Sequence, residues 1–446
     1  MCGMKVLRKS TLAMCVLLLG SVTLAHAVTY GVEQITPAAV GNTTYTIQSG
    51  NQYLNNLGQV VGESRTYSDD KVYNQGPRAF RWSHGRSQPL GTLGSDALGY
   101  GESNPSAIND VGLVAGRSLQ FVNAIDRGPR AFVGRAGRLL QLETGAFVAS
   151  EAVAMNARGE VAGSGRRFEQ GQDRGTRALL WTEQRPLDLG TLGVASSGFG
   201  WSAATALNTN RQVVGSSLVY GSGGNGLGQH AFFWANGAMR DLGVLGVDLG
   251  FSFSYAIAIN RNSRVVGYSD VYDSAGNWLG QHAFLWAGGT MQDLGVLGVD
   301  LGFSFSTATA INTNNQVLGS SDVYDSAGNW VGQHAFLWAG GTMQDLGALS
   351  VDEFGTSFSF PNALNDAGQV VGVSTQSENG VAVGNRAFLY QNGAMVDLNT
   401  LLPADSGLLL ENALAVNNRG QITAFGTRTT AEGTYQVYVL LTPLKR

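Results

Sequence analysis

Eight copies of one short motif divide this chain into units of similar length. Each copy is an Asn, followed three residues later by a turn residue and then by Val or Ile and usually Gly. Successive copies lie 47 to 54 residues apart, and a fixed period of this size is typical of propellers and solenoids. The chain is therefore expected to be built from one repeated unit. The eight residues are Asn55, Asn109, Asn156, Asn208, Asn260, Asn312, Asn365 and Asn417.

Each unit is expected to contain four short strands. The units that begin at Phe251 and Phe303 are nearly identical and show the pattern best. In the second of them, runs rich in Val, Phe, Trp and Ala alternate with Gly and Asn, as strands and tight turns do. The four expected strands cover residues 306–311, 316–321, 334–338 and 343–346.

The repeated Asn has a backbone explanation. Asn is favoured at the start of a type I turn because its side chain accepts a nearby backbone N–H. Gly three residues later supplies the left-handed conformation that completes the hairpin. Arg211 and Ser263 stand where Gly is expected and are predicted to carry strain, which Asn315 tolerates better. We interpret the eight Asn as turn residues and not as a ring that binds a ligand.

A large aromatic residue recurs at one position of the third strand. If Asn236-Gly237 forms a two-residue turn, Trp234 lies opposite Met239 in the hairpin. Large aromatics at a fixed register are predicted to pack between neighbouring sheets. The residues at this position are Trp82, Trp181, Trp234, Trp286, Trp338 and Tyr390.

Strand counting favours a closed ring. The eighth unit ends in its third strand, residues 435–441, and lacks a fourth. An extra strand, residues 30–35, precedes the first unit and completes the last sheet if the chain closes on itself. An open solenoid has no use for such a strand and needs capping repeats instead. We predict an all-β fold, a single β-propeller of eight four-stranded blades closed by the N-terminal strand, with seven blades or a β-solenoid as alternatives.

The first 27 residues are expected to be a signal peptide, and residues 28–446 the propeller domain. A basic start, an apolar run over residues 12–20 and the small residues Ala25 and Ala27 form the usual pattern. We therefore expect an exported protein that is periplasmic or extracellular.

Charge and cysteine content limit the possible partners. Cys2 and Cys15 both lie in the signal segment, so the mature chain is expected to have no disulfide. Of 28 basic residues three lie in that segment, which leaves 25 against 32 acidic residues. An acidic surface with few lysines argues against nucleic acid or an anionic membrane as partner. The other apolar stretches are short, so we expect no membrane insertion, and we expect a monomer.

Three units share a longer motif. The sequences HAFFW at His230 and HAFLW at His282 and His334 occur together with DLGVLG at Asp241 and Asp293. In these motifs the chain resembles the bacterial extracellular HAF-repeat family. The resemblance implies an exported, propeller-like repeat protein, and it implies no activity. The His is not an obligatory chemical group, because four units have Arg before the Ala. These are Arg78, Arg130, Arg177 and Arg386.

The antiparallel strands of a propeller place the loops on two faces. The first-to-second and third-to-fourth turns are tight and share one face, whereas the second-to-third hairpins and the blade connections are long and share the other. Because binding residues usually gather on variable loops, the long-loop face is expected to bind a ligand. The candidate residues there are His230, His282, His334, Trp278 and Trp330.

Two sets of side chains on this face need separate interpretations. Exchange of the three His with Arg favours a polar surface role or pairing with a carboxylate, and equivalent positions in neighbouring blades are too far apart for one metal ion. The aromatics of the blade connections are expected mainly in the core, although exposed ones would suit sugar rings or peptides. These aromatics are Phe199, Trp201, Phe251, Phe253, Phe303, Phe305, Phe358 and Phe360.

Calcium is the one cofactor that the sequence hints at. The segment DVYDSAGN supplies Asp270 and Asp273, and its copy supplies Asp322 and Asp325. Calcium requires several converging oxygens, often as Asp-x-Asp-x-Asp-Gly, and this spacing does not match, whereas Asp before Ser-Ala-Gly-Asn is ordinary turn sequence. No catalytic residue and no Ser/His/Asp arrangement is indicated. We expect a non-catalytic scaffold that binds protein or glycan, with a polysaccharide hydrolase or lyase as the alternative.

Overall fold

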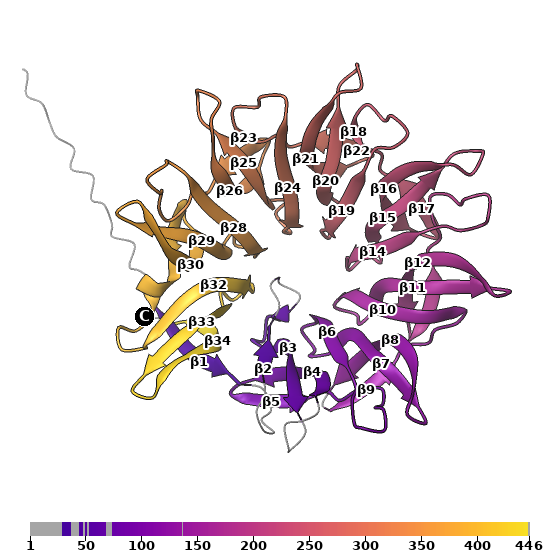
Figure 1. Ribbon diagram of the computed structural model, residues 1–446, viewed down its shortest axis with the longest axis horizontal. Helices are drawn as coiled ribbons and strands as arrows, with labels where there is room; N and C mark the ends of the chain where they lie inside the picture. The colour runs from indigo at the N-terminus through magenta and orange to yellow at the C-terminus, as the bar shows by residue number, and fades with distance from the viewer. Residues whose placement is uncertain are drawn as a thin grey trace, which may run out of the picture.

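The computed structural model describes residues 29–36, 44–47, 50, 53–67, 74–135 and 137–444. The predicted signal peptide, with Cys2 and Cys15, lies outside these residues. The described residues form eight four-stranded blades arranged in a ring around a central axis (Figure 1). Within each blade, consecutive strands pair antiparallel, so the prediction of an all-β eight-bladed propeller is confirmed. Seven blades and an open solenoid are excluded.

Blades 1 to 4 follow the N-terminal strand β1 (Tyr30–Ile35). Blade 1 contains β2 (Thr44–Thr46), β3 (Val60–Tyr67), β4 (Asn74–Ser83) and β5 (Arg86–Pro89). Blade 2 contains β6 (Ser103–Ile108), β7 (Val114–Val122), β8 (Ile125–Arg135) and β9 (Arg138–Gln141). Blade 3 contains β10 (Phe147–Met155), β11 (Val161–Glu169), β12 (Gln172–Thr182) and β13 (Arg185–Asp188). Blade 4 contains β14 (Ser202–Leu207), β15 (Val213–Tyr220), β16 (Gly226–Ala235) and β17 (Ala238–Asp241).

Blades 5 to 8 complete the ring. Blade 5 contains β19 (Ser254–Ile259), β20 (Val265–Tyr272), β21 (Trp278–Ala287) and β22 (Thr290–Asp293). Blade 6 contains β24 (Ser304–Ile311), β25 (Val317–Tyr324), β26 (Trp330–Ala339) and β27 (Thr342–Asp345). Blade 7 contains β28 (Ser357–Leu364), β29 (Val370–Glu378), β30 (Val381–Gln391) and β31 (Ala394–Asp397), and the 3₁₀ helix η2 (Leu398–Leu401) follows it. Blade 8 contains β32 (Leu408–Val416), β33 (Ile422–Thr430) and β34 (Gly433–Pro443), with β1 as its outer strand.

The ring is closed by the N-terminal strand, as predicted. Strand β1 pairs antiparallel with β34, from Tyr30 opposite Pro443 to Ile35 opposite Tyr438. Tyr30 and Ile35 are almost completely buried, so the strand contributes to the core as well as to the sheet. Figure 1 shows β1 crossing from blade 1 to the outer edge of blade 8. The last blade is therefore built from both ends of the described chain.

The core lies between the blades, where the third-strand aromatics pack as predicted. Trp234 of blade 4 is 6 % exposed and packs with Ala162 and Leu180 of blade 3. It lies opposite Met239 in the hairpin. Burial of a large aromatic side chain at each such junction contributes about 1.5–3 kcal/mol by transfer alone. The Phe of the HAF motif is buried beside the Trp in blades 4, 5 and 6.

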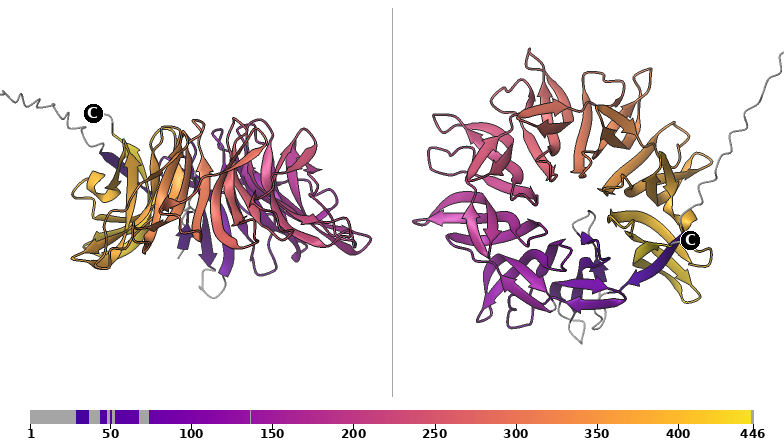
Figure 2. Two further views of the ribbon diagram at one scale, coloured as in Figure 1. Left: turned by 90° about the horizontal axis from the view of Figure 1, so that it is seen from above. Right: turned by 180° about the vertical axis from the view of Figure 1, so that it is seen from behind.

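Short strands in the connections that precede β19 and β24 pair with the blade that follows, and parallel pairs of β21 with β24 and of β26 with β28 join blades 5, 6 and 7. Strand β18 (Leu245–Gly246) pairs parallel with β20, and β23 (Leu297–Gly298) pairs parallel with β25. We call the side with these connections and the second-to-third hairpins the long-loop face, and the opposite side, with the Asn turns, the Asn face. Figure 2 shows the two faces as the flat sides of a disc. Among the described residues, no helix is sufficiently long and apolar to cross a membrane.

Candidate functional site

Aromatic side chains form three clusters on the long-loop face. Trp278 packs edge-to-face on Phe303, with ring centroids 5.3 Å apart, and Phe305 contacts both rings. A second cluster joins Phe251 to Tyr272 of the same blade as Trp278, and a third joins Trp330 of blade 6 to Phe358 and Phe360 of blade 7. We call the whole set the aromatic strip. It consists of Phe251, Tyr272, Trp278, Phe303, Phe305, Trp330, Phe358 and Phe360.

Much of the aromatic strip is open to solvent. Trp278 and Trp330 are 44 % and 47 % exposed, and Phe251 and Phe303 are 55 % and 48 % exposed. None of the eight blade-connection aromatics is fully buried, so the expectation that they lie mainly in the core is wrong. The reason is their position: they lie in or just before the first strand of a blade, on the long-loop face.

The local sequence explains how Trp278 is presented. Asp273 Oδ1 accepts hydrogen bonds from the backbone N–H of Ala275 and Asn277, at 2.8 Å each, and this closes a tight turn at the end of the hairpin. Gly276 in this turn has φ +85°, a conformation that Gly adopts without strain. Trp278 then lies opposite Tyr272 across the hairpin. Asp325 makes the same turn before Trp330.

Asp270 and Asp322 have a different role from the turn aspartates. Each is half-buried and interacts with the side chain of a Trp, Trp278 for Asp270 and Trp330 for Asp322. Burial raises the pKa of both carboxyl groups, and the interactions with Trp oppose this effect only in part. The interaction places a carboxylate beside each Trp ring.

The four aspartates do not converge as calcium ligands do. In the part of the chain that the structure describes, no group of three or more His, Cys, Asp or Glu side chains could hold a metal ion. Asp273 and Asp325 cap turns, and Asp270 and Asp322 interact with Trp side chains. Each carboxylate therefore has protein partners that account for its position without a cation.

The three HAF histidines lie inside the molecule. Their exposed fractions are only 3 %, 5 % and 8 % for His230, His282 and His334. Of the two interpretations, a polar surface role is therefore excluded and pairing with a carboxylate remains. Nδ1 of His282 lies 2.8 Å from Asp293 Oδ2, and the other two contact the equivalent Asp. In the unbound protein their rings are not part of the ligand-accessible surface.

Two of these histidines contact an Asp through Nδ1 and a Ser of the next blade through Nε2, so that Asp, His and Ser form a series. His282 Nε2 lies 3.1 Å from Ser304 Oγ, and His334 Nε2 lies 2.8 Å from Ser357 Oγ. The structure therefore contains two Asp/His/Ser series of contacts, which the sequence does not indicate. Ser304 is completely buried and Ser357 nearly so, so neither hydroxyl can reach a substrate. The series links one blade to the next instead.

Arg at the position of this His also forms hydrogen bonds to the following blade. Arg78 donates to the backbone oxygen of Gly99 at 2.9 Å, and Arg130 donates to that of Val148 at 2.6 Å. Arg177 makes the corresponding bond to Gly200. Each acceptor lies in the connection or first strand of the following blade. In these blades, imidazole and guanidinium are thus two means of contacting the following blade, whereas Arg386 donates to the backbone oxygen of its own neighbour Asn385.

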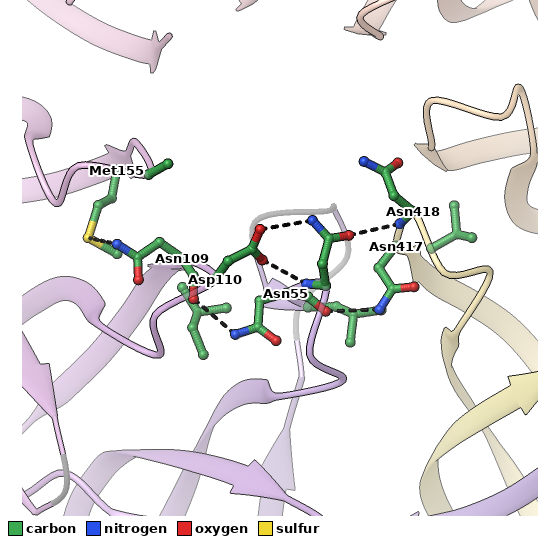
Figure 3. A pocket seen from close by; sticks show the side chains of 11 residues that line it. Asn55, Asn109, Asp110, Met155, Asn417 and Asn418 are labelled. Atoms are coloured by element: carbon green, nitrogen blue, oxygen red, sulfur yellow. Dashed lines mark hydrogen bonds between the residues drawn. The ribbon is translucent and has the colours of Figure 1, made fainter. Parts of the chain in front are cut away.

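The Asn face carries an arrangement that the sequence interpretation missed. Each repeated Asn accepts the N–H groups of its own turn, as expected. Its Nδ2 also donates to the backbone oxygen of the next repeated Asn, at 2.9–3.4 Å. These bonds form a closed ring of eight Asn, which we call the Asn ring. Figure 3 shows the part of it from Asn417 through Asn55 to Asn109. The sequence held one signal for it, because a Gln often follows four residues after the Asn and accepts the second Nδ2 hydrogen.

The three non-Gly turn residues also join blades. Arg211, Ser263 and Asn315 have φ of 60°, 60° and 64°, as predicted. Arg211 Nε donates to the buried Glu160, and Ser263 Oγ donates to Gln212 at 2.7 Å. Each side chain contacts the preceding blade, so the contact offsets the cost of the left-handed conformation.

The Asn ring surrounds a mouth of the central channel. A cavity of about 430 Å³ there is lined from blade 3 round to blade 8, and a second of about 240 Å³ adjoins it near blade 1. Apolar residues that precede the Asn, such as Met155 and Leu207, form its floor. The residues that follow the Asn form its rim, and unlike the Asn they differ from blade to blade.

Comparison with known proteins adds little about activity. The family described as "Protein of unknown function (DUF3466)" matches residues 248–438. No curated protein matches the chain. Among solved structures, the β-propeller domain of the trilobed protease from Pyrococcus furiosus has 8 % identity and a TM-score of 0.44, with 81 % of this chain and 96 % of that chain covered.

Two further solved structures are similarly distant. The polysaccharide lyase Uly1 has 8 % identity and a TM-score of 0.37, with 94 % of this chain and 98 % of that chain covered. A sialidase of Trypanosoma rangeli in complex with 2,3-difluorosialic acid has 9 % identity and a TM-score of 0.32, with 90 % of this chain and 54 % of that chain covered. The match thus spans about half of the sialidase.

Proposed function

We propose that this chain is an exported, non-catalytic HAF-repeat propeller that binds a glycan along the aromatic strip of its long-loop face. The observation that carries the proposal is the repetition of an exposed Trp beside a carboxylate on two consecutive blades, Trp278 with Asp270 and Trp330 with Asp322. The signal-peptide pattern of the first 27 residues supports export to the periplasm or the cell exterior.

The chemistry of the aromatic strip suits a sugar chain. A pyranose ring presents one apolar face, which packs on an aromatic ring, and hydroxyl groups at its edge, which need hydrogen-bond acceptors. Trp278 offers the apolar surface, and Asp270 offers acceptor oxygens next to it. An exposed aromatic surface of this kind on a soluble domain is typical of a binding site.

The repeat itself favours a polymer over a small ligand. Two nearly identical units place the same Trp and Asp at equivalent points of neighbouring blades. A ligand made of repeated units can occupy both points with the same contacts, whereas a single small molecule uses only one. A folded protein partner needs no such periodicity, so glycan is the better of the two expected ligands.

The alternative of a polysaccharide hydrolase or lyase has less support. The His of both Ser/His/Asp series is engaged between a carboxylate and a buried Ser. The fold alone carries no activity, because propellers of one architecture host unrelated functions.

Affinity electrophoresis in gels containing soluble polysaccharides tests the proposal. The wild-type protein is expected to be retarded by at least one polysaccharide, and the variant Trp278→Ala/Trp330→Ala is expected to bind about tenfold more weakly or worse, since loss of ~1.4 kcal/mol changes the affinity tenfold. Phe168→Ala is the matched control, because Phe168 is an exposed aromatic outside the strip. Retardation that is equal for the double variant and the wild type would refute the proposed site.

A further inference from the structure

The residue directly after each ring Asn forms the rim of the channel mouth on the Asn face. We call these eight residues the rim residues. They are Asn56, Asp110, Ala157, Thr209, Arg261, Thr313, Asp366 and Asn418. The repeat does not fix their identity, although it fixes the backbone around them. Differences among them are therefore differences in what the mouth can bind.

One half of the rim satisfies its own backbone. The N–H of Thr313 donates to Asp366 Oδ1 at 3.0 Å, and the N–H of Asp366 donates to Asn418 Oδ1 at 2.9 Å. The N–H of Asn418 donates to Asn56 Oδ1 at 3.0 Å, and the N–H of Asn56 donates to Asp110 Oδ1 at 2.8 Å. Every rim Asp or Asn thus caps the N–H of the rim residue in the preceding blade. Figure 3 shows the links around Asp110 and Asn418.

The other half of the rim lacks these caps. The rim residue that should cap Asp110 is Ala157, and the next two are Thr209 and Arg261, none of which is Asp or Asn. Among the described residues, the backbone N–H groups of Asp110, Ala157, Thr209 and Arg261 have no acceptor. Because the backbone repeats, these four N–H groups point along the rim as their capped counterparts do. We call this segment the open arc.

We propose that the open arc is a binding site for a small polycarboxylate. The residues Ala157, Thr209 and Arg261 line the cavity of about 430 Å³, which is large enough for such a molecule. Carboxylate oxygens can accept from these solvent-exposed N–H groups, and Arg261 adds a guanidinium that can bind a carboxylate through two hydrogen bonds. The apolar floor, with Met155, Leu207 and Ile259, suits the carbon skeleton between the carboxylates.

The closed half of the rim shows what the open arc can hold. There, the carboxylate of Asp366 accepts from the N–H and the hydroxyl of Thr313 and from Asn418 Nδ2. The protein itself thus places a carboxylate against a rim N–H. A carboxylate from outside can occupy the equivalent position where the rim residue provides none.

The rim carboxylates do not block the open arc. Asp110, at one end, directs Oδ1 and Oδ2 to the backbone N–H and Nδ2 of Asn56, in the opposite direction. Asp366 directs its oxygens to Thr313 and Asn418. Both carboxylates are therefore engaged by hydrogen-bond donors on the closed half, and Arg261, which also interacts electrostatically with Asp366, is the cationic rim side chain of the open arc.

Isothermal titration with citrate tests the site. The wild-type protein is expected to bind citrate and not its neutral analogue triethyl citrate. The variant Ala157→Asn/Thr209→Asn supplies the amide oxygens that cap rim N–H groups elsewhere, and it is expected to weaken citrate binding at least about tenfold because the ligand then has fewer donors. Asn is already a rim residue at Asn56 and Asn418, so the blade turn accepts it without a change of fold.

Two further variants separate charge from backbone capping. Arg261→Gln is expected to weaken citrate binding by a similar factor and to reduce its dependence on salt. Arg158→Gln removes an exposed cation of the Asn face that does not line this cavity, and is expected to leave binding unchanged. Absence of citrate binding by the wild type, unchanged binding by the capped variant, or equal affinity for sulfate would each overturn the assignment. None of these results depends on glycan binding at the opposite face.

Discussion

Asn417 Nδ2 donates a hydrogen bond of 2.9 Å to the backbone oxygen of Asn55, which precedes it by 362 residues in the chain. This bond is the last of the Asn ring, and it closes the inner edge of the molecule as β1 closes the outer edge of blade 8. The same side chain accepts the N–H groups of Arg419 and Gln421 in its own turn. One residue type therefore shapes the turn of a blade and attaches that blade to the next.

The two roles of the ring Asn can be separated by Asn312→Asp. Aspartate still accepts the turn N–H groups, but it cannot donate to Asn365 or Gln316, and its second oxygen then faces two acceptors. We expect the free energy of unfolding to fall by about 2–4 kcal/mol, since loss of a buried donor leaves acceptors unsatisfied. Chemical denaturation measures this change.

The control for this variant is Asn379→Asp. Asn379 is an exposed turn residue with φ 52° and lies outside the Asn ring. It is expected to change stability by less than about 0.5 kcal/mol, as surface substitutions usually do. If both variants had equally small effects, the repeated Asn would be a turn residue and nothing more.

The pairs of His and Asp predict a pH dependence of stability. Burial alone would lower the pKa of His282, but the hydrogen bond and charge of Asp293, together with Asp300, outweigh it and raise the pKa. A His whose pKa is raised on folding stabilises the protein below its unfolded pKa, ~6.5, and this stabilisation is lost as the pH rises through the folded value. We expect the stability difference between wild type and His282→Gln to shrink from pH 6 towards pH 9.

The measurement is the urea midpoint at several pH values for wild type and variant. Tyr435→Gln, an exposed substitution far from these pairs, controls for general effects of pH. A stability difference that stays constant over this range would show that His282 does not change its protonation there. His230, whose pKa is raised by Asp241 and Asp248 against the effect of burial, is expected to behave in the same way.

Asp270 is expected to reduce stability at neutral pH. Burial raises the pKa of Asp270, so the folded protein prefers the protonated carboxyl group. Stability is therefore lost as the pH rises through the pKa of the folded protein and the buried group becomes charged. Asp270→Asn keeps an acceptor oxygen for the side chain of Trp278 and removes the charge. We expect Asp270→Asn to raise the melting temperature at pH 7 and to raise it less at pH 4. We also expect the variant to bind glycan more weakly, because binding groups are commonly destabilising. Thermal unfolding at both pH values and gel retardation check the three outcomes.

The repeat allowed the fold to be predicted from sequence but hid much of the site. A period near 52 residues and the extra strand at residues 30–35 were sufficient to predict eight blades and the closure of the ring. Both features can be read from the order of strands along the chain. The Asn ring was missed because its donors and acceptors lie one full unit apart, and local turn chemistry already explained the same residue. The burial of His282 was missed for a related reason: Ser304, its partner, belongs to the next blade. Contacts between units cannot be read from the pattern within one unit.

The turn residues Arg211 and Ser263 provide a test of such contacts between blades. Replacement of either by Gly relieves a left-handed backbone, which favours Gly by about 1 kcal/mol. Ser263→Gly also removes one partly buried hydrogen bond to Gln212, so the two effects are expected to cancel within about 1 kcal/mol. Arg211→Gly instead leaves the carboxylate of Glu160, which is 6 % exposed, without its guanidinium. We expect Arg211→Gly to lower the free energy of unfolding by about 2 kcal/mol. The unpaired buried carboxylate destabilises the protein by more than the relief of backbone strain stabilises it. Parallel denaturation of the two variants gives the answer, and an Arg211→Gly protein as stable as Ser263→Gly would mean that backbone strain governs this position.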